Sequence, residues 1–263
     1  MGDAPTEGTV RSADGTTIAY ERSGDGPAVI LVDAAGGFRD FGPMRSLAAL
    51  LAPTCTVICF DRRGRGASTD TAPYTVDREV DDLRALVAVA GGAAGLYGFS
   101  SGAVLALLAA ARGVPVTRLA PLDLTGEPDP DPGLAAEVAA LVAAGRRGDA
   151  VALFQSRIGV PEELTAGLRH SPFWPALESS AHTLVHDLAL TRALSPAELA
   201  TVTVPTLVAQ SANSDARLRG WARGVAGALP DGRHLSLAGD WHQVTVEELA
   251  PVLAGFLTDR RDG

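Results

Sequence analysis

The sequence has 263 residues, of which 46% are hydrophobic and 20% are charged, and this length is enough for one α/β domain with a large core. A formal net charge of −9 at pH 7 argues against nucleic acid or an anionic membrane surface as a partner, since both attract basic patches. All 22 basic residues are arginine, which excludes any mechanism that needs a Schiff-base or general-base lysine.

The start of the chain gives no sign of export. Residues 1–6 lack the basic and apolar regions of a secretory signal. No apolar run approaches the ~20 residues that a membrane-spanning helix needs. We therefore expect a cytoplasmic protein.

Strand-like and helix-like segments alternate over the first half of the chain, which predicts a mostly parallel sheet with helices on both faces. Residues 28–32 form a continuous apolar run, as expected for a central strand that is buried on both faces. The expected strands cover residues 9–12, 17–22, 28–32, 57–60, 96–99 and 116–122, and the expected helices cover residues 41–51, 76–90 and 102–112.

The two cysteines, Cys55 and Cys59, lie four residues apart in an apolar run that is typical of a strand. Four residues of strand span ~13 Å, which is beyond the reach of a disulfide bond. Both are therefore expected to be small buried hydrophobic residues.

The alternation stops between residue 125 and about residue 202, where an acidic, proline-rich run is followed by helical segments and no strand is predicted. It resumes with a strand at residues 206–210, a helix at 217–229, a strand at 234–237 and a helix at 246–258. We interpret residues 125–202 as a helical cap inserted into a core of residues 1–124 and 203–263, without being an independent domain. Such a cap would lie over the strand edge where open α/β sheets bind ligands.

The sharpest functional signal is the run Gly98-Phe99-Ser100-Ser101-Gly102, which follows a predicted strand and opens a predicted helix. In that context the pattern G-x-S-x-G predicts a nucleophile elbow, a strained turn that exposes the serine between two glycines. Centring the pattern on Ser101 would put Phe99 and Ala103 at the glycine positions, so Ser100 is the candidate nucleophile. The other interpretation is an ordinary small-residue turn.

The chain resembles the α/β-hydrolases along nearly its whole length. Besides the elbow, residues 60–68 (FDRRGRGAS) look like the D-x-R-G-x-G-x-S turn that this family has after its fourth strand. The resemblance implies the α/β-hydrolase fold, with a mostly parallel eight-stranded sheet, helices on both faces and a helical cap after the sixth strand. We expect residues 60–68 to shape the loop and pack the core, without a catalytic role.

Of the five histidines, only His242 lies in the loop after the last predicted strand, where the family places its histidine. A neutral imidazole there can accept the Ser100 proton during attack and return it to the leaving alkoxide. His234 falls within the preceding strand and is expected to pack or to face solvent. The remaining three are expected at solvated helix positions of the cap: His170, His182 and His186.

The acid that orients the histidine has more than one candidate. The family most often carries it after the seventh strand in a P-x-L-x-x-x-G-x-x-D pattern, but Ser211 and Ser214 stand where glycine and aspartate are expected. Asp215 comes one residue after the position where this pattern expects aspartate. Some family members carry the acid directly after the sixth strand, where Asp123 lies, and we favour Asp123 over Asp215. A helix cap is the other interpretation of Asp123. Asp240 ranks third because it is too close to the histidine in sequence.

Two backbone N–H groups should stabilise the charge that develops on the carbonyl oxygen of a substrate. By resemblance to the family, one comes from Ser101, directly after the nucleophile. The other would come from residues 33–37, where many relatives have His-Gly and this chain has Asp-Ala-Ala-Gly-Gly. Because the contribution comes from the backbone, alanine can supply it, and we choose Ala35 ahead of Ala34.

Four aromatic residues are expected near the nucleophile, and together they suggest an apolar substrate. The other interpretation of each is a core residue that does not contact the substrate. The layout is similar to that of zearalenone lactonases, which combine a Ser-Ser elbow with an acid after the sixth strand and a tryptophan in the cap. The acid of those enzymes is glutamate, and Asp123 is one methylene shorter. The four residues are Phe38, Phe99, Trp174 and Trp241.

These observations predict a serine hydrolase that cleaves a carboxylic ester or lactone of an apolar small molecule through an acyl-enzyme on Ser100. No metal or organic cofactor is expected. The fold leaves open three alternatives: cofactor-free C–C hydrolysis or perhydrolysis, biosynthetic cyclisation or acyl transfer, and a small-ligand receptor with a vestigial triad. The sequence is compatible with a homodimer.

Overall fold

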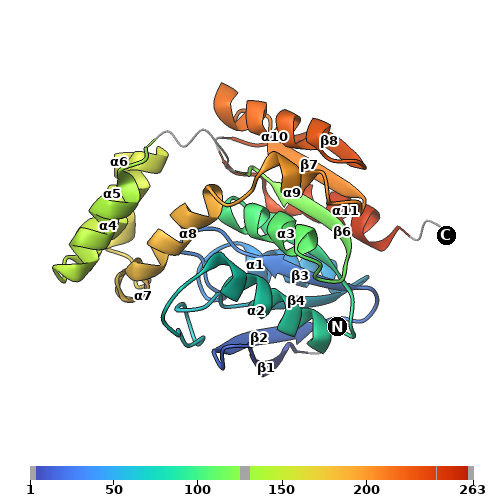
Figure 1. Cartoon of the computed structure of the whole chain (residues 1–263), viewed down its shortest axis with the longest axis horizontal. Coiled ribbons are helices and arrows are strands. Elements are labelled where there is room, and N and C mark those ends of the chain that lie inside the picture. Colours follow the sequence, from blue (N-terminus) through green and yellow to red (C-terminus); the bar gives the residue numbers. More distant parts are fainter. Residues whose placement is uncertain (1–3, 125–130, 241, 260–263) are drawn as a thin grey trace.

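The computed structural model describes residues 4–124, 131–240 and 242–259, which form an eight-stranded sheet covered by helices (Figure 1). The strand order is β1-β2-β4-β3-β5-β6-β7-β8, and only the pairs β1–β2 and β2–β4 are antiparallel. The predicted mostly parallel sheet is therefore confirmed. The strands are β1 (Thr6–Arg11), β2 (Thr17–Ser23), β3 (Ala28–Val32), β4 (Thr56–Phe60), β5 (Ala94–Phe99), β6 (Val116–Leu122), β7 (Thr206–Ser211) and β8 (Gly232–Leu237).

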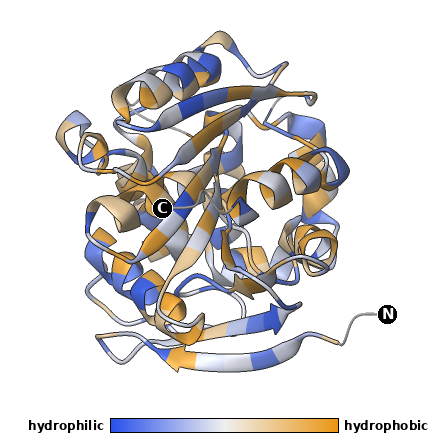
Figure 2. Ribbon diagram, turned by 90° about the vertical axis from the view of Figure 1, so that its right-hand side faces the viewer, coloured by the Kyte–Doolittle hydropathy of each residue, from blue (hydrophilic) through white to orange (hydrophobic). Residues whose placement is uncertain are grey.

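Helices cover both faces of the sheet, as predicted. On one face, α1 (Met44–Leu51) and α11 (Val246–Thr258) pack against the strands. On the other face lie α2 (Val76–Val89), α3 (Ser101–Ala111) and α10 (Ala216–Ala228). Hydrophobic and hydrophilic residues alternate along the helices on both sides of the sheet (Figure 2). α3 is an exception: its sequence, SGAVLALLAAA, has no strongly polar face, and it is buried between the sheet and its neighbouring helices.

The chain between β6 and β7 contains only helices in its described part, residues 131–205. We call it the α4–α9 segment. Its helices have an apolar core of their own, and Phe38 from the loop after β3 packs into that core. Figure 1 shows α4, α5 and α6 together beside the sheet. The elements are α4 (Leu134–Ala143), α5 (Arg147–Ile158), α6 (Glu162–Arg169), α7 (Trp174–Ser179), the 3-10 helix η1 (Ala181–Thr183), α8 (Leu184–Thr191) and α9 (Pro196–Leu199).

Two predicted boundaries move by three residues. β1 begins at Thr6 and not at residue 9, because the strand pairs with β2 along its whole length. α1 begins at Met44 and not at residue 41, because Phe38 and Phe41 exchange backbone hydrogen bonds of 3.2 and 2.8 Å in a short bridge ahead of the helix. The other predicted elements end within two residues of their observed bounds.

The thiols agree with the prediction from their spacing, since Cys55 and Cys59 are free and buried. Burial raises the pKa of both thiols, so neither is a ready nucleophile at neutral pH. No helix in the part of the chain that the structure describes is long and apolar enough to cross a membrane.

Candidate active site

Ser100 lies in the turn between β5 and α3 with φ 54° and ψ −120°, a conformation that residues with a side chain rarely adopt. The two flanking glycines are required by close backbone contacts. A Cβ atom at Gly98 would lie 2.4 Å from the carbonyl oxygen of Gly102, and one at Gly102 would lie 2.3 Å from that of Val32. The tight strand-to-helix turn that the motif predicts is therefore present at Ser100.

His242 and Asp123 come together from the loops that follow β8 and β6. Nδ1 of His242 lies 3.9 Å from Oδ2 of Asp123. The imidazole also lies beside the elbow, because its ring centroid is 4.8 Å from that of Phe99, the residue before Ser100. The Asp123 side chain is fully buried, whereas 16% of the His242 side chain is exposed. The imidazole is thus the member of the pair that a bound molecule can meet.

Ser100, Asp123 and His242 share an unusual backbone conformation. Among the residues that the structure describes, they are the non-glycine residues with positive φ, at 54°, 45° and 53° respectively. Such a conformation costs about 1–3 kcal/mol per residue, and residues that adopt it cluster at functional sites. Three strained positions on three separate loops therefore mark this edge of the sheet as a site.

Two serines at the end of β7 hold Asp123 in place. The N–H of Ser211 donates to Oδ1 of Asp123 at 2.9 Å, and its hydroxyl donates to Oδ2 at 2.7 Å. The Ser214 hydroxyl donates to Oδ1 at 3.4 Å and accepts a hydrogen bond of 3.3 Å from the N–H of His242. In the sequence these serines look only like departures from a glycine and an aspartate. In the structure they bind a carboxylate that comes from the neighbouring strand.

The other two candidate acids have different partners. Asp215 is the N-cap of α10, where it accepts a hydrogen bond of 2.9 Å from the N–H of Leu218, and its side chain is 42% exposed. Asp240 is exposed and accepts a hydrogen bond of 3.4 Å from Asn213. Asp215 is thus a helix cap, whereas the Asp123 carboxylate binds Ser211 and Ser214, and the segment that Asp123 was considered to cap begins in residues outside the described ranges. The geometry favours Asp123 as the partner of the imidazole.

The surroundings of His242 keep it available as a base. Burial lowers the pKa of its imidazole, while the carboxylates of Asp123 and Asp215 act in the opposite direction and only partly offset the burial. The ring is therefore neutral at neutral pH. A neutral imidazole near a serine hydroxyl can accept its proton.

The loop after β3 distinguishes between the two candidate oxyanion donors. The N–H of Ala34 is already used, because it donates to Oδ1 of Asp33 at 2.7 Å. The N–H of Ala35 makes no hydrogen bond to another backbone group in the described part of the chain. Ser101 is the first residue of α3, where N–H groups lack a partner within the helix. The hydrogen bonds therefore leave the N–H of Ala35 more available than that of Ala34, and the oxyanion role of Ala35 and Ser101 stays a prediction.

The aromatic residues predicted near the substrate have different surroundings. Phe38 and Trp174 are 6% and 9% exposed and belong to the apolar core of the α4–α9 segment. Phe99 is half-buried against the His242 ring. Trp241 lies outside the described residues. Contact between these side chains and a substrate stays a prediction.

The histidines outside the candidate site correct one expectation. His170 and His234 are exposed, as predicted. His186 is not a solvated helix residue: its ring stacks on Tyr74 with centroids 3.7 Å apart, and burial lowers its pKa to about 4. His182 is half-buried and bonded to Asp70 at 3.1 Å through Nε2, so it too has a protein partner.

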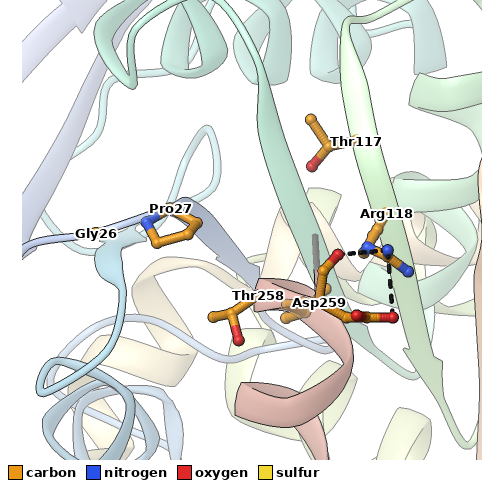
Figure 3. Close-up of a pocket in the computed structure, with 7 residues that line it drawn as sticks. Gly26, Pro27, Thr117, Arg118, Thr258 and Asp259 are labelled. Atoms are coloured by element: carbon orange, nitrogen blue, oxygen red, sulfur yellow. Dashed lines mark hydrogen bonds and ion pairs between the residues drawn. The ribbon is translucent and has the colours of Figure 1, made fainter. Parts of the chain in front are cut away.

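No group of three or more His, Cys, Asp or Glu side chains in the described ranges could hold a metal ion. A hollow lies at the opposite edge of the sheet, where the parallel strands begin, and Arg118 pairs there with Asp259 at 3.6 Å (Figure 3). Ser100 follows the carboxyl end of β5, so this hollow is separate from the candidate site. Its lining includes Gly26, Pro27, Thr117, Arg118, Leu257 and Asp259.

Comparison with known proteins gives consistent matches. Residues 29–252 match the model of a family described as "Alpha/beta hydrolase family". Over 97 residues the chain is 36% identical to the "Uncharacterized hydrolase YraK" of Bacillus subtilis (strain 168), and the match spans 35% of this chain and 35% of that protein.

Solved structures extend the match to almost the full length. An alpha/beta hydrolase from Sphaerobacter thermophilus DSM 20745 has 45% sequence identity and a TM-score of 0.87, over 95% of this chain and 99% of that chain. The enol-lactonase from Burkholderia xenovorans LB400 has 22% identity and a TM-score of 0.70, over 95% of this chain and all of the other (100%). The second likeness concerns the fold alone.

Proposed function

The chain belongs to the alpha/beta hydrolase family, and on that premise we propose that it is a serine hydrolase of carboxylic esters or lactones. The observation that carries the proposal is the convergence of three strained residues from separate loops, with Asp123 3.9 Å from His242 and His242 packed on the residue before Ser100. A hydroxyl, a neutral imidazole and a buried carboxylate in this order are the groups that acyl transfer needs.

In the proposed reaction, Oγ of Ser100 bonds to the substrate's carbonyl carbon while Nε2 of His242 takes the hydroxyl proton. Asp123 faces Nδ1, so it fixes the tautomer and stabilises the imidazolium. The oxyanion accepts hydrogen bonds from the N–H groups of Ala35 and Ser101. The bond to the alcohol oxygen then breaks, and the alcohol leaves with the proton from His242. Water that the same imidazole deprotonates releases the acid.

We infer that the α4–α9 segment caps this site and that the substrate is apolar. Phe38, on the loop that also carries the oxyanion donor Ala35, packs against the core of that segment. The side chains that meet there are aliphatic and aromatic, with Trp174 of α7 among them. Such surroundings favour an apolar acyl or alcohol group over a charged one.

The direct test is labelling of the purified chain with a fluorophosphonate, followed by mass spectrometry of its peptides. We expect one adduct, on the peptide that contains Ser100, and hydrolysis of p-nitrophenyl butyrate that labelling abolishes. A panel of lactones and esters of graded size would then define the substrate class. An adduct on another residue, or no hydrolysis of any ester or lactone, would refute the proposal.

The pH dependence of hydrolysis should report the titration of His242. Activity needs the neutral ring, and burial lowers its pKa, so kcat/KM should fall with decreasing pH only below the ordinary imidazole value of about 6.5. Asp123→Asn removes a charge that favours the imidazolium, so it should move the His242 pKa further down. Rate profiles from about pH 4.5 to 9, and NMR titration of the ring in both proteins, measure these effects. An acid limb above the ordinary value would contradict the assignment.

A further inference from the structure

We propose that Asp187, on α8, is a positioning residue for the oxyanion hole, which aligns both N–H donors through two buried arginines and the Ser101 hydroxyl. The inference rests on the proposed function, because the donors matter only when an oxyanion forms on the substrate. It assigns a role in catalysis to the α4–α9 segment, and to a loop for which the sequence predicted only packing.

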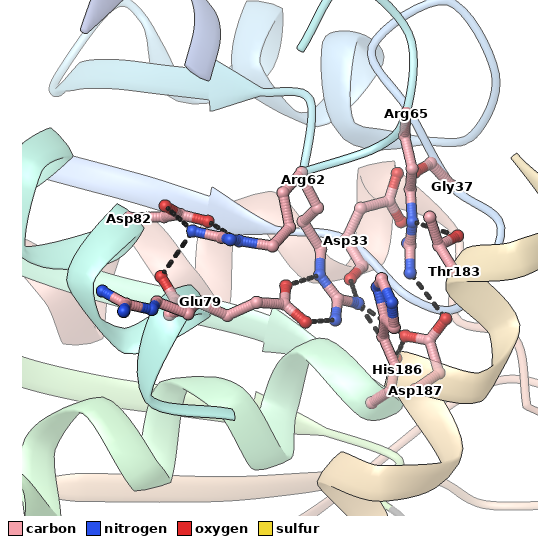
Figure 4. A network of polar contacts seen from close by, with 12 residues as sticks. Asp33, Gly37, Arg62, Arg65, Glu79, Asp82, Thr183, His186 and Asp187 are labelled. Carbon is pink, nitrogen blue, oxygen red and sulfur yellow. Dashed lines mark hydrogen bonds and ion pairs between the residues drawn. The ribbon is translucent and has the colours of Figure 1, made fainter. Parts of the chain in front are cut away.

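Four buried charges join the loop after β4 to α2 and α8 (Figure 4). Oδ1 of Asp187 lies 2.8 Å from Nη1 of Arg62, and its Oδ2 lies 2.5 Å from Nη2 of Arg65. Glu79 binds the other edge of Arg62 through hydrogen bonds of 2.8 and 2.9 Å. None of the four side chains is more than 2% exposed. The cluster is electrically balanced, with two guanidinium groups and two carboxylates.

Asp187 is charged in this cluster. Burial raises the pKa of its carboxyl group, but the neighbouring Arg65 and Arg62 outweigh burial and bring the pKa below its ordinary value. A fixed negative charge between two guanidinium groups holds both of them in one orientation. Asp187 therefore helps to set the directions in which the arginines donate their other hydrogen bonds, together with Glu79 at Arg62 and Thr183 at Arg65.

The first oxyanion donor, the N–H of Ala35, belongs to the peptide whose carbonyl oxygen accepts a hydrogen bond from Arg65. Nη1 of Arg65 donates to the carbonyl oxygen of Ala34 at 2.7 Å, and Nη1 of Arg62 donates to that of Asp33 at 3.2 Å. In a planar trans peptide the carbonyl of one residue and the N–H of the next point in opposite directions. Fixing the Ala34 carbonyl on Arg65 thus turns the N–H of Ala35 away from the arginine, and leaves it available to a substrate oxygen.

The second oxyanion donor is held by the same carboxylate. The hydroxyl of Ser101 donates to Oδ1 of Asp187 at 2.8 Å and accepts a hydrogen bond of 3.2 Å from Arg62. These bonds fix the residue whose N–H begins α3. One carboxylate therefore positions both donors, which come from loops after different strands.

A neighbouring cluster provides the comparison. Arg63 is as buried as Arg62 and binds Asp82 through two hydrogen bonds of 2.8 Å and Asp14 through one of 2.9 Å. Its remaining hydrogen bond goes to the carbonyl of Arg78, at 3.0 Å. The hydrogen bonds of the Arg63 side chain thus lead to α2 and the β1–β2 turn, away from residues 33–37 and from Ser101. If buried arginine–carboxylate pairs had only a structural role, removing one carboxylate charge from either cluster would change kcat to the same extent.

The test compares Asp187→Asn with Asp82→Asn. For Asp187→Asn we expect kcat for an ester to fall on the order of 10–100-fold, less than the 10²–10³-fold typical for complete loss of an oxyanion donor. KM should change little, because the donors act mainly in the transition state, and affinity for a trifluoromethyl ketone should fall in parallel with kcat/KM. Asp82→Asn should lower the unfolding midpoint in urea without changing kcat. Equal losses of kcat in both variants, or an increase in KM without a change in kcat, would overturn the proposal.

Ser101→Ala provides a second test in case Asp187→Asn does not fold. It removes one hydroxyl and keeps the backbone N–H, so we expect a several-fold fall in kcat with KM nearly unchanged. The unfolding midpoint should fall moderately, because Asp187 and Arg62 each lose a buried hydrogen bond. An unchanged kcat in Ser101→Ala, with wild-type affinity for the ketone, would refute the positioning role. Failure of the proposed function would look different, since the wild-type protein would then hydrolyse no ester and take no fluorophosphonate label at Ser100.

Discussion

Replacing Ser100 with alanine should lower kcat for ester hydrolysis by about 10⁶-fold, the scale of loss measured when the serine of a serine protease triad is removed. The physical reason is that alanine has no hydroxyl at the point where the elbow presents the Ser100 side chain, ahead of α3 at φ 54°, and the hydroxyl of the next residue, Ser101, is bound to Asp187. The measurement is turnover of p-nitrophenyl butyrate together with labelling by a fluorophosphonate. Both should disappear, while circular dichroism and the unfolding midpoint stay close to those of the wild type.

Two variants serve as controls for that loss. Ser46→Ala changes an exposed serine on α1 and should retain full activity and labelling. Ser100→Gly should be as inactive as Ser100→Ala but more stable than it by about 1 kcal/mol, because glycine adopts positive φ without the strain that a Cβ imposes. Labelling that persists in either Ser100 variant would place the nucleophile elsewhere.

The second large effect is expected at Asp123. Asp123→Asn should reduce kcat by about 10⁴-fold, because an amide can no longer hold the imidazole in the tautomer that accepts the serine proton or stabilise the imidazolium. The two serines that now donate to both carboxylate oxygens would also oppose one end of the amide, since its NH₂ group cannot accept their hydrogen bonds. Steady-state kinetics on one ester measures the effect.

Asp215→Asn is the matched variant, with the same chemical change at the other candidate acid. Asparagine caps a helix about as well as aspartate, so the start of α10 should remain intact. We expect kcat within a few-fold of the wild type. If Asp215→Asn removes activity and Asp123→Asn does not, the two residues must exchange roles.

The features that the sequence predicted well are those whose causes are local. The elbow could be predicted because its two glycines and its strand-to-helix context occupy a few consecutive residues, and the same holds for the buried apolar run of β3. The helix α3 could be predicted because an apolar helix of small residues must be buried. His242 could be placed because it is the histidine that follows the last strand.

The features that could not be predicted depend on contacts between distant residues. Asp187 meets Arg62 across 125 residues of sequence, and nothing in the local pattern of either residue indicates the other. The same is true of Ser211 and Ser214, which bind Asp123 from about 90 residues away because parallel neighbouring strands end at one edge. His186 was expected in solvent because helical spacing does not reveal that Tyr74 covers it.

The buried cluster that joins the loop after β4 to α2 and α8 limits how this protein can be redesigned. Anyone who replaced the α4–α9 segment with that of a relative, to broaden the range of accepted molecules, would remove Asp187 and Thr183, the residues that bind Arg65 from that side. The graft would then leave a buried guanidinium without its counter-ion, and the chimaera would be expected to misfold or to turn over slowly. A combinatorial library is better confined to α6, which buries none of its side chains and can change without disturbing the arginines.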